Sequence, residues 1–124
     1  MVEGIFIDSD KPTVRAVIAW EQAVQNPYFI LDTGFTGDLV VTNDVAKDLG
    51  LEISGVTKAN LAGNKGVEVP TATALAIMEG RSLYVTVFVI PEGWPLLGIS
   101  FMEKFGYKAI VDCKNKKVRL EVVS

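Results

Sequence analysis

The chain has 124 residues, 49% of them hydrophobic and 22% charged, which is enough to bury the core of one domain and too apolar for a disordered segment. The net charge of −3 comes from acidic and basic residues interspersed along the chain, so no basic stripe is present and nucleic acid is not an expected partner. The absence of histidine excludes Ser-His-Asp and Cys-His nucleophiles and the Cys/His zinc sites, because each of them needs an imidazole.

Cysteine content and hydropathy indicate where the protein is expected to work. Cys113 is the one cysteine and cannot form an internal disulfide. The sequence shows neither a secretory leader nor an apolar run of membrane-spanning length. We therefore expect a soluble, cytoplasmic protein that forms a single domain over residues 1–124, with no membrane partner.

Period-2 patterns and β-branched runs recur along the chain and predict strands. The first two runs, EGIFID and TVRAVIAW, flank the turn SDKP and predict a hairpin. Further strands are predicted in YFILD, DLVVT, GVEVPTATALAIM, LYVTVFVI, YKAIVD and KVRLEVV. The turn EGRS precedes LYVTVFVI, and the turn CKNK joins the last two runs. The sequence therefore predicts a mostly β domain.

Two short helices are predicted between the strands. The segment TNDVAKDLG offers Thr42 or Asn43 as an N-cap, and Gly50 is expected to end the helix. In SFMEKFG, Ser100 and Glu103 have the spacing of a capping box, and a glycine again follows the last turn.

The two halves of the chain follow a similar pattern. Each half has an apolar strand, a glycine, and a capped short helix that ends at a glycine. Gly34 and Gly98 hold comparable positions in ILDTG and PLLGIS. The likeness lies in the pattern rather than in residue identity, and it predicts pseudo-duplicated halves.

Asp32 follows the apolar run YFIL, where a carboxylate would be partly desolvated. Gly34 has no Cβ, so its backbone N–H can approach this carboxylate or a ligand closely. The Thr33 hydroxyl can bond a neighbouring backbone group. Asp-Thr-Gly is also ordinary turn chemistry. The tripeptide alone therefore leaves two readings open, a structural turn and a carboxylate placed for chemistry.

Three segments, in this order, resemble the retropepsin-like branch of the aspartic proteases. The segment ILDTGFTGDLVV resembles their apolar-apolar-Asp-Thr-Gly signature, NLAGNKGVEVP the glycine-bearing flap hairpin, and PLLGISFMEKF the apolar-apolar-Gly segment with its helix. The resemblance extends from about Val14 to about Val122. It implies a small closed β-barrel of the retropepsin-like type with one or two short helices.

The resemblance also implies an activity, that of an aspartic endopeptidase. It implies that Asp32 is the catalytic residue, with Thr33 and Gly34 forming the active-site turn. Because one chain supplies one such motif and the chemistry needs paired carboxylates, a homodimer acting on extended polypeptide is expected. No metal or cofactor is expected. The expected substrate-binding residues are Phe35, Ala62, Gly63, Asn64 and Leu97.

The sequence departs from the family pattern at two places. Phe35 stands where many members carry Ser or Ala, and a phenyl ring cannot make the hydrogen bond of a hydroxyl. The flap reads LAGNKG, without the aspartate that often precedes its glycine. A catalytically silent dimerisation or peptide-binding module is therefore the alternative. Asp38 and Asp112 are interpreted as solvated turn carboxylates.

Overall fold

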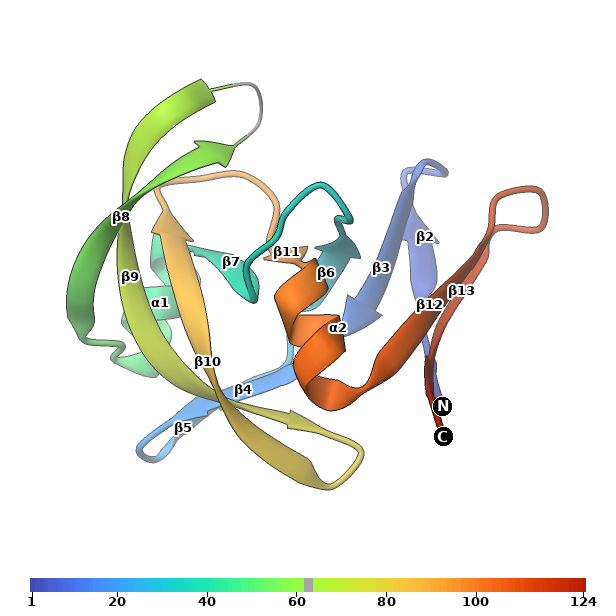
Figure 1. Cartoon of the computed structure of the whole chain (residues 1–124). Coiled ribbons are helices and arrows are strands. Elements are labelled where there is room, and N and C mark those ends of the chain that lie inside the picture. Colours follow the sequence, from blue (N-terminus) through green and yellow to red (C-terminus); the bar gives the residue numbers. More distant parts are fainter. Residues whose placement is uncertain (62–63) are drawn as a thin grey trace.

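The computed structural model describes residues 1–61 and 64–124, and most of this part of the chain is β-structure in two sheets (Figure 1). The larger sheet contains β2 (Ile5–Ile7), β3 (Lys11–Arg15), β4 (Val17–Trp20), β5 (Ala23–Gln25), β6 (Tyr28–Leu31), β7 (Leu39–Thr42), β8 (Ile53–Leu61), β9 (Asn64–Met78), β10 (Arg81–Ile90) and β11 (Leu96–Leu97). The smaller sheet contains β1 (Val2–Glu3), β12 (Tyr107–Asp112) and β13 (Lys117–Val122). The helices are α1 (Asn43–Leu49) and α2 (Ile99–Phe105).

The larger sheet curls around the core, as Figure 1 shows. Its strand order is β2-β3-β6-β11-β7-β10-β9-β4-β5, with β8 paired to β9. Among the described residues, β2, β5 and β8 each pair with a single strand, so the sheet is curled but has free edges. The prediction of a mostly β domain with one or two short helices is confirmed, and the barrel that was expected to be closed is a curled half-barrel sheet.

Side chains that point to one face of the strands form the core. In β10 the buried positions are Val85, Val87 and Val89, every second residue, as expected for a strand with one face on the core. The turn before β10 has positive φ at Glu79 (49°) and Gly80 (78°), the conformation that closes a two-residue hairpin. The predicted hairpin turn at EGRS is confirmed.

Both helices end at the predicted glycines. Gly50 and Gly106 adopt the left-handed conformation, with φ of 67° and 70°, and return their N–H groups to carbonyls of the preceding turn. Each helix follows a short apolar strand, β7 or β11. The two halves thus share the predicted pattern of strand, helix and terminal glycine.

The predicted capping box in the second helix is wrong. The N-cap is Gly98, two residues before the predicted Ser100, and the helix begins at Ile99, so Ser100 lies inside the first turn. The reason is tertiary, because the N–H of Gly98 is bonded to the carbonyl of Asp38 at 2.9 Å. This bond fixes the chain at Gly98, and the helix starts directly after it.

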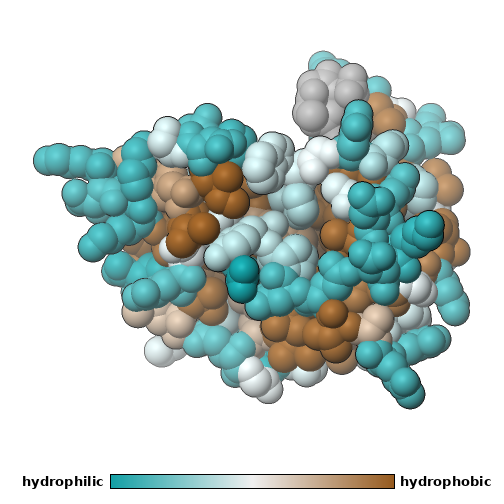
Figure 2. Space-filling model, turned by 180° about the vertical axis from the view of Figure 1, so that it is seen from behind, coloured by the Kyte–Doolittle hydropathy of each residue, from teal (hydrophilic) through white to brown (hydrophobic). Residues whose placement is uncertain are grey.

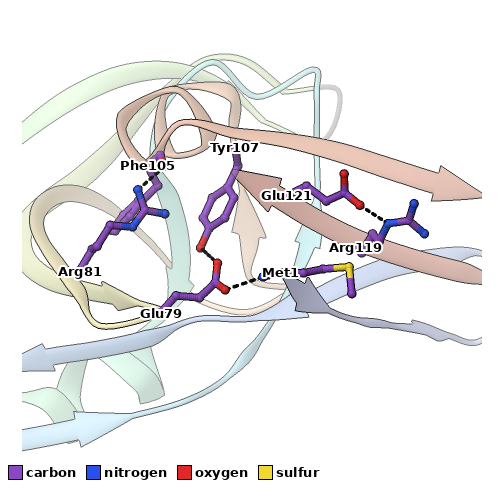
Figure 3. Close-up of polar contacts among 7 residues, drawn as sticks. All are labelled: Met1, Glu79, Arg81, Phe105, Tyr107, Arg119 and Glu121. Atoms are coloured by element: carbon purple, nitrogen blue, oxygen red, sulfur yellow. Dashed lines mark hydrogen bonds and ion pairs between the residues drawn. The ribbon is translucent and has the colours of Figure 1, made fainter. Parts of the chain in front are cut away.

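The smaller sheet brings the two termini side by side (Figure 1). Strand β1 pairs with β13, with Val2 opposite Leu120. Nearby, Glu79 accepts hydrogen bonds from the Tyr107 hydroxyl and from the Met1 ammonium, both at 2.6 Å (Figure 3). These bonds join the β9–β10 turn to the smaller sheet.

Apolar side chains on the surface are scattered among hydrophilic ones. On the face seen in Figure 2, brown apolar patches are interrupted by teal hydrophilic side chains. The exposed large apolar residues include Val24, Ile53, Val56, Tyr84, Trp94 and Val122. No helix of the described residues is long and apolar enough to cross a membrane.

Candidate active site

Asp32 lies directly after β6, at the start of the loop that runs to β7. This loop passes the end of β11, which lies between the two strands, parallel to β6 and antiparallel to β7. The side chain of Asp32 is half-buried, whereas Thr33 and Gly34 are exposed. The three residues of the predicted active-site turn therefore lie together at the surface end of a buried strand.

Gly34 supports the carboxylate of Asp32 directly. Its backbone N–H donates to Oδ1 of Asp32 at 2.9 Å, which is the close approach that the glycine was expected to allow. A Cβ at Gly34 would lie 3.2 Å from the same oxygen. A side chain at this position would therefore crowd the acceptor that the N–H serves.

Backbone hydrogen bonds fasten the loop to the segment that follows it in space. The N–H of Asp32 donates to the carbonyl of Leu97 at 3.0 Å, and the N–H of Ile99 donates to the carbonyl of Phe35 at 2.9 Å. Within the loop, the N–H of Phe35 donates to the carbonyl of Asp32 at 3.1 Å. The Asp32 loop is thus hydrogen-bonded to the predicted second glycine segment, PLLG, and to the residue that follows it.

Phe35 packs into this support. Its side chain is 7% exposed and meets Phe88 edge-on at 5.3 Å between ring centroids. A Cβ at Gly37 would lie 2.6 Å from Cζ of Phe35, and a Cβ at Gly98 would lie 2.6 Å from its Cδ2. The ring therefore fits only because both neighbouring positions are glycine.

Two of the expected substrate-binding side chains need correction. Leu97 is fully buried, and Phe35 is nearly so. Neither side chain has the surface needed to contact a polypeptide substrate, because both are held in the core beneath the loop. The backbone of both residues bonds the loop, since the carbonyl of Leu97 accepts the N–H of Asp32 and the N–H of Phe35 donates to the carbonyl of Asp32.

The expected flap is a hairpin of β8 and β9, which rises at the same end of the molecule as the loop after β6 (Figure 1). Ala62 and Gly63 lie outside the described residues. Asn64 is the first residue of β9 and pairs with Leu61. Gly66 has a φ of 67°, and its N–H donates to Oδ1 of Asn60 at 2.9 Å.

Asp38 differs from its interpretation as a solvated turn carboxylate. It is 3% exposed, and its Oδ2 accepts hydrogen bonds from the backbone N–H of Thr86 at 2.9 Å and from Nζ of Lys104 at 2.7 Å. The apolar run LVVT that follows was the available signal of burial. Asp112, by contrast, does accept turn hydrogen bonds from Asn115, as expected.

Neither a metal site nor the groove described next involves the Asp32 loop among the described residues. Residues 1–61 and 64–124 contain no group of three or more His, Cys, Asp or Glu residues that could hold a metal ion. A groove of about 690 Å³ lies between β2 and the β12–β13 hairpin, and residues such as Phe6, Ile110 and Lys116 line it. None of the candidate site residues lines this groove.

Solved structures of known proteins are similar to the chain in fold. No model of a known protein family matches the chain, and no curated protein matches its sequence. Among solved structures, the EIAV protease complexed with the inhibitor HBY-793 is similar with a TM-score of 0.61 and 18% identity, over 86% of this chain and 98% of that one. A retropepsin-like aspartic protease from Rickettsia conorii is similar with a TM-score of 0.63 and 17% identity, over 95% and 87% of the two chains. The chain therefore has the fold of the retropepsin-like aspartic proteases.

Proposed function

We propose that this protein is an aspartic endopeptidase that works as a homodimer, with one Asp32 carboxyl from each copy. The observation that carries the proposal is the hydrogen bond from Gly34 to Oδ1 of Asp32, in a loop fastened to Leu97 and Gly98 within a retropepsin-like fold. The loop thereby presents a supported carboxylate at the surface, where a second copy can approach it. The chain is proposed to act as a single domain, residues 1–124.

The proposed reaction needs two carboxyls that share one proton. At a separation of about 3 Å the two cannot both be ionised, so one stays protonated. The unprotonated Asp32 takes a proton from a water molecule, which attacks the carbonyl carbon of the scissile peptide bond. The protonated Asp32 donates to the carbonyl oxygen, and a proton then passes to the leaving nitrogen.

Two features of the chain support the proposal of a second copy. One chain contributes one Asp32, and its neighbours Thr33 and Gly34 are exposed at the tip of the loop. In the family that the sequence resembles, the threonines of the two turns lock together across the dimer axis, and we propose the same role for Thr33. Gly34 would leave room for an extended substrate.

Substrate is proposed to bind between the Asp32 loop and the β8–β9 hairpin. The hairpin would fold over an extended polypeptide and exclude water from the reacting groups. Roles for Ala62, Gly63 and Asn64 in this contact remain predictions from the sequence. A cytoplasmic location likewise remains a prediction.

The first test is cleavage of an unstructured polypeptide by the purified protein and by Asp32→Asn. We expect cleavage by the wild type, faster at acidic pH because the pair must keep one proton, and none by Asp32→Asn. The matched control is Asp44→Asn, which removes an exposed carboxylate in the first turn of α1 and should leave the rate unchanged. Full activity of Asp32→Asn would refute the proposal.

A silent dimerisation or peptide-binding module is the second candidate function, and the position of Phe35 favours it. A phenyl ring occupies the place after Asp-Thr-Gly and packs on Phe88, so no side-chain hydroxyl is available there to tune the Asp32 carboxyl. A peptide mimic with a central hydroxyl separates the two functions, because such mimics exploit the geometry of the transition state. If the wild type binds the mimic tightly and Asp32→Asn does not, the protein is an enzyme. If the two proteins bind the mimic with equal affinity, the protein is a binding module.

A further inference from the structure

Asp38 is a buried carboxylate at the far end of the loop that begins at Asp32. Its side chain is 3% exposed, and both of its hydrogen bonds are accepted by Oδ2, one from the backbone N–H of Thr86 and one from Nζ of Lys104. Its backbone carbonyl accepts the N–H of Gly98 at 2.9 Å. Three elements, β10, α2 and the junction of β11 with α2, therefore meet at this one residue.

The bonds at Asp38 close the loop onto the same segment that holds its beginning. Asp32 donates its N–H to the carbonyl of Leu97, and Asp38 accepts the N–H of the next residue, Gly98. The two ends of the loop are thus fixed to two adjacent residues. Strand β6 holds the chain just before Asp32, and β7, which pairs with β10 and β11, holds it just after Asp38. The bonds of Asp38 act on the loop between these two strands, so a shift of Asp38 would change the path of the loop and the orientation of the turn that carries the Asp32 carboxyl.

Stability alone does not account for a carboxylate at this place. The carboxylate of Asp38 is buried, but the side chain of its partner Lys104 is 42% exposed, and solvent weakens the attraction in such a pair. Oδ1 of Asp38 has no hydrogen-bond partner among residues 1–61 and 64–124, and an unpaired buried oxygen is destabilising. The bonds to Thr86 and Lys104 are directional, however, and an apolar side chain cannot reproduce them.

We propose that Asp38, held by Lys104, is a positioning residue that sets the orientation of the Asp32 loop for catalysis. The inference rests on the proposed protease function. Asp38 is too buried to contact substrate, so it acts through the backbone of the loop. Its removal should therefore change the rate of the chemical step more than the binding of substrate.

The kinetic test compares Asp38→Asn and Lys104→Met with Glu79→Gln. Glu79 is a matched control because it also accepts two hydrogen bonds, from Tyr107 and Met1, but lies in the turn between β9 and β10 (Figure 3). We expect Asp38→Asn to lower kcat by on the order of 10- to 100-fold with KM within about twofold. Glu79→Gln should leave both values unchanged.

Lys104 gives a second variant that avoids a failure to fold. Its side chain is 42% exposed, so Lys104→Met should be tolerated. We expect a smaller fall in kcat than for Asp38→Asn, with KM unchanged, and recovery of the rate in Lys104→Arg, which restores the charge. Wild-type kcat in both Asp38→Asn and Lys104→Met would overturn the proposal, and so would a loss confined to KM.

Amide hydrogen exchange tests the positioning without any activity. At denaturant concentrations that equalise global stability, the amides of Asp32, Gly98 and Ile99 should exchange at least about tenfold faster in Asp38→Asn and at the wild-type rate in Glu79→Gln. Unchanged exchange in Asp38→Asn would overturn the inference. A wild-type protein that cleaves nothing would refute the protease function, and the exchange rates would still decide whether Asp38 holds the loop.

Discussion

Phe35 and Gly98 approach each other so closely that no side chain fits between them. A Cβ at Gly98 would lie 2.6 Å from Cδ2 of Phe35 and 2.3 Å from the carbonyl oxygen of Gly37, and both distances are too short for carbon. The glycine of PLLG is thus required by the ring that follows Asp-Thr-Gly. The Asp32 loop and the start of α2 form one packed unit.

Gly98→Ala is expected to disrupt this unit. Because the added methyl group would meet backbone as well as the ring, the structure must shift, and we expect a loss of about 3 kcal/mol in the free energy of unfolding. Urea unfolding measures the loss. Gly55→Ala is the control, since its Cβ would lie 3.2 Å from the hydroxyl of Thr71, which is a milder contact. Equal stability of the two variants would contradict the packing described.

Gly34→Ala should affect catalysis rather than folding. Its Cβ would lie 3.2 Å from Oδ1 of Asp32, so the carboxyl must move by a few tenths of an ångström. We expect kcat to fall by roughly tenfold, with the unfolding free energy lowered by less than about 1 kcal/mol.

A glycine far from the site provides the comparison for Gly34→Ala. Gly50 ends α1 with a φ of 67°, and a Cβ there meets nothing within 4 Å. Gly50→Ala should cost about 1 kcal/mol of stability through backbone strain and leave kcat unchanged. The prediction fails if the two variants show the reverse pattern, with activity lost in Gly50→Ala and kept in Gly34→Ala.

Stability at high pH should depend on Tyr107. Burial, and then the hydrogen bond to Glu79, raise the pKa of Tyr107 to about 12 from the ordinary value of 10.0. The folded state therefore holds this proton more tightly than the unfolded state. The stabilisation is complete below pH 10 and is lost as the pH rises from about 10 to about 12, by roughly 2 kcal/mol.

Tyr107→Phe isolates this contribution. The variant has no phenolic proton, so its unfolding free energy should decline less between pH 10 and pH 12 than that of the wild type. Urea titrations at several pH values in this range measure both curves. Parallel curves would show that the proton on Tyr107 is held equally in the folded and unfolded states.

Mixing experiments test whether two copies share the site. An excess of Asp32→Asn protein added to the wild type should lower its activity, because mixed dimers contain one Asp32 carboxyl instead of two. Asp44→Asn, changed only at an exposed position on α1, should not lower it. Activity that is indifferent to added Asp32→Asn would mean that one copy is sufficient, contrary to the proposed mechanism.

Local sequence signals predicted most of the fold. The alternation in β10, the turn at Glu79 and Gly80, and the terminal glycines Gly50 and Gly106 each follow from residues close together in the chain. Such features depend on side-chain period and on backbone conformation. They are therefore readable without knowledge of distant contacts.

The features that the sequence did not predict depend on contacts between residues far apart in the chain. The start of α2 moved to Ile99 because Gly98 is bonded to Asp38. Asp38 itself was misread because its partners, Thr86 and Lys104, are far along the chain. The turn at Asp32 could be predicted because its tripeptide is a local motif. The burial of Leu97 depends instead on the position of β11 between β6 and β7, which joins segments far apart in the chain.

The place of β11 between β6 and β7 has a consequence for synthesis of the protein. The Asp32 turn is translated before Leu97 and Gly98, whose backbone groups bond the loop and which lie about 65 residues further along the chain. Until those residues have been synthesised, the loop lacks the backbone hydrogen bonds to Leu97 and Gly98. The backbone hydrogen bonds that hold both ends of the loop can therefore form only after residues 97 and 98 have left the ribosome, so the loop is completed late in synthesis although its own residues are made early.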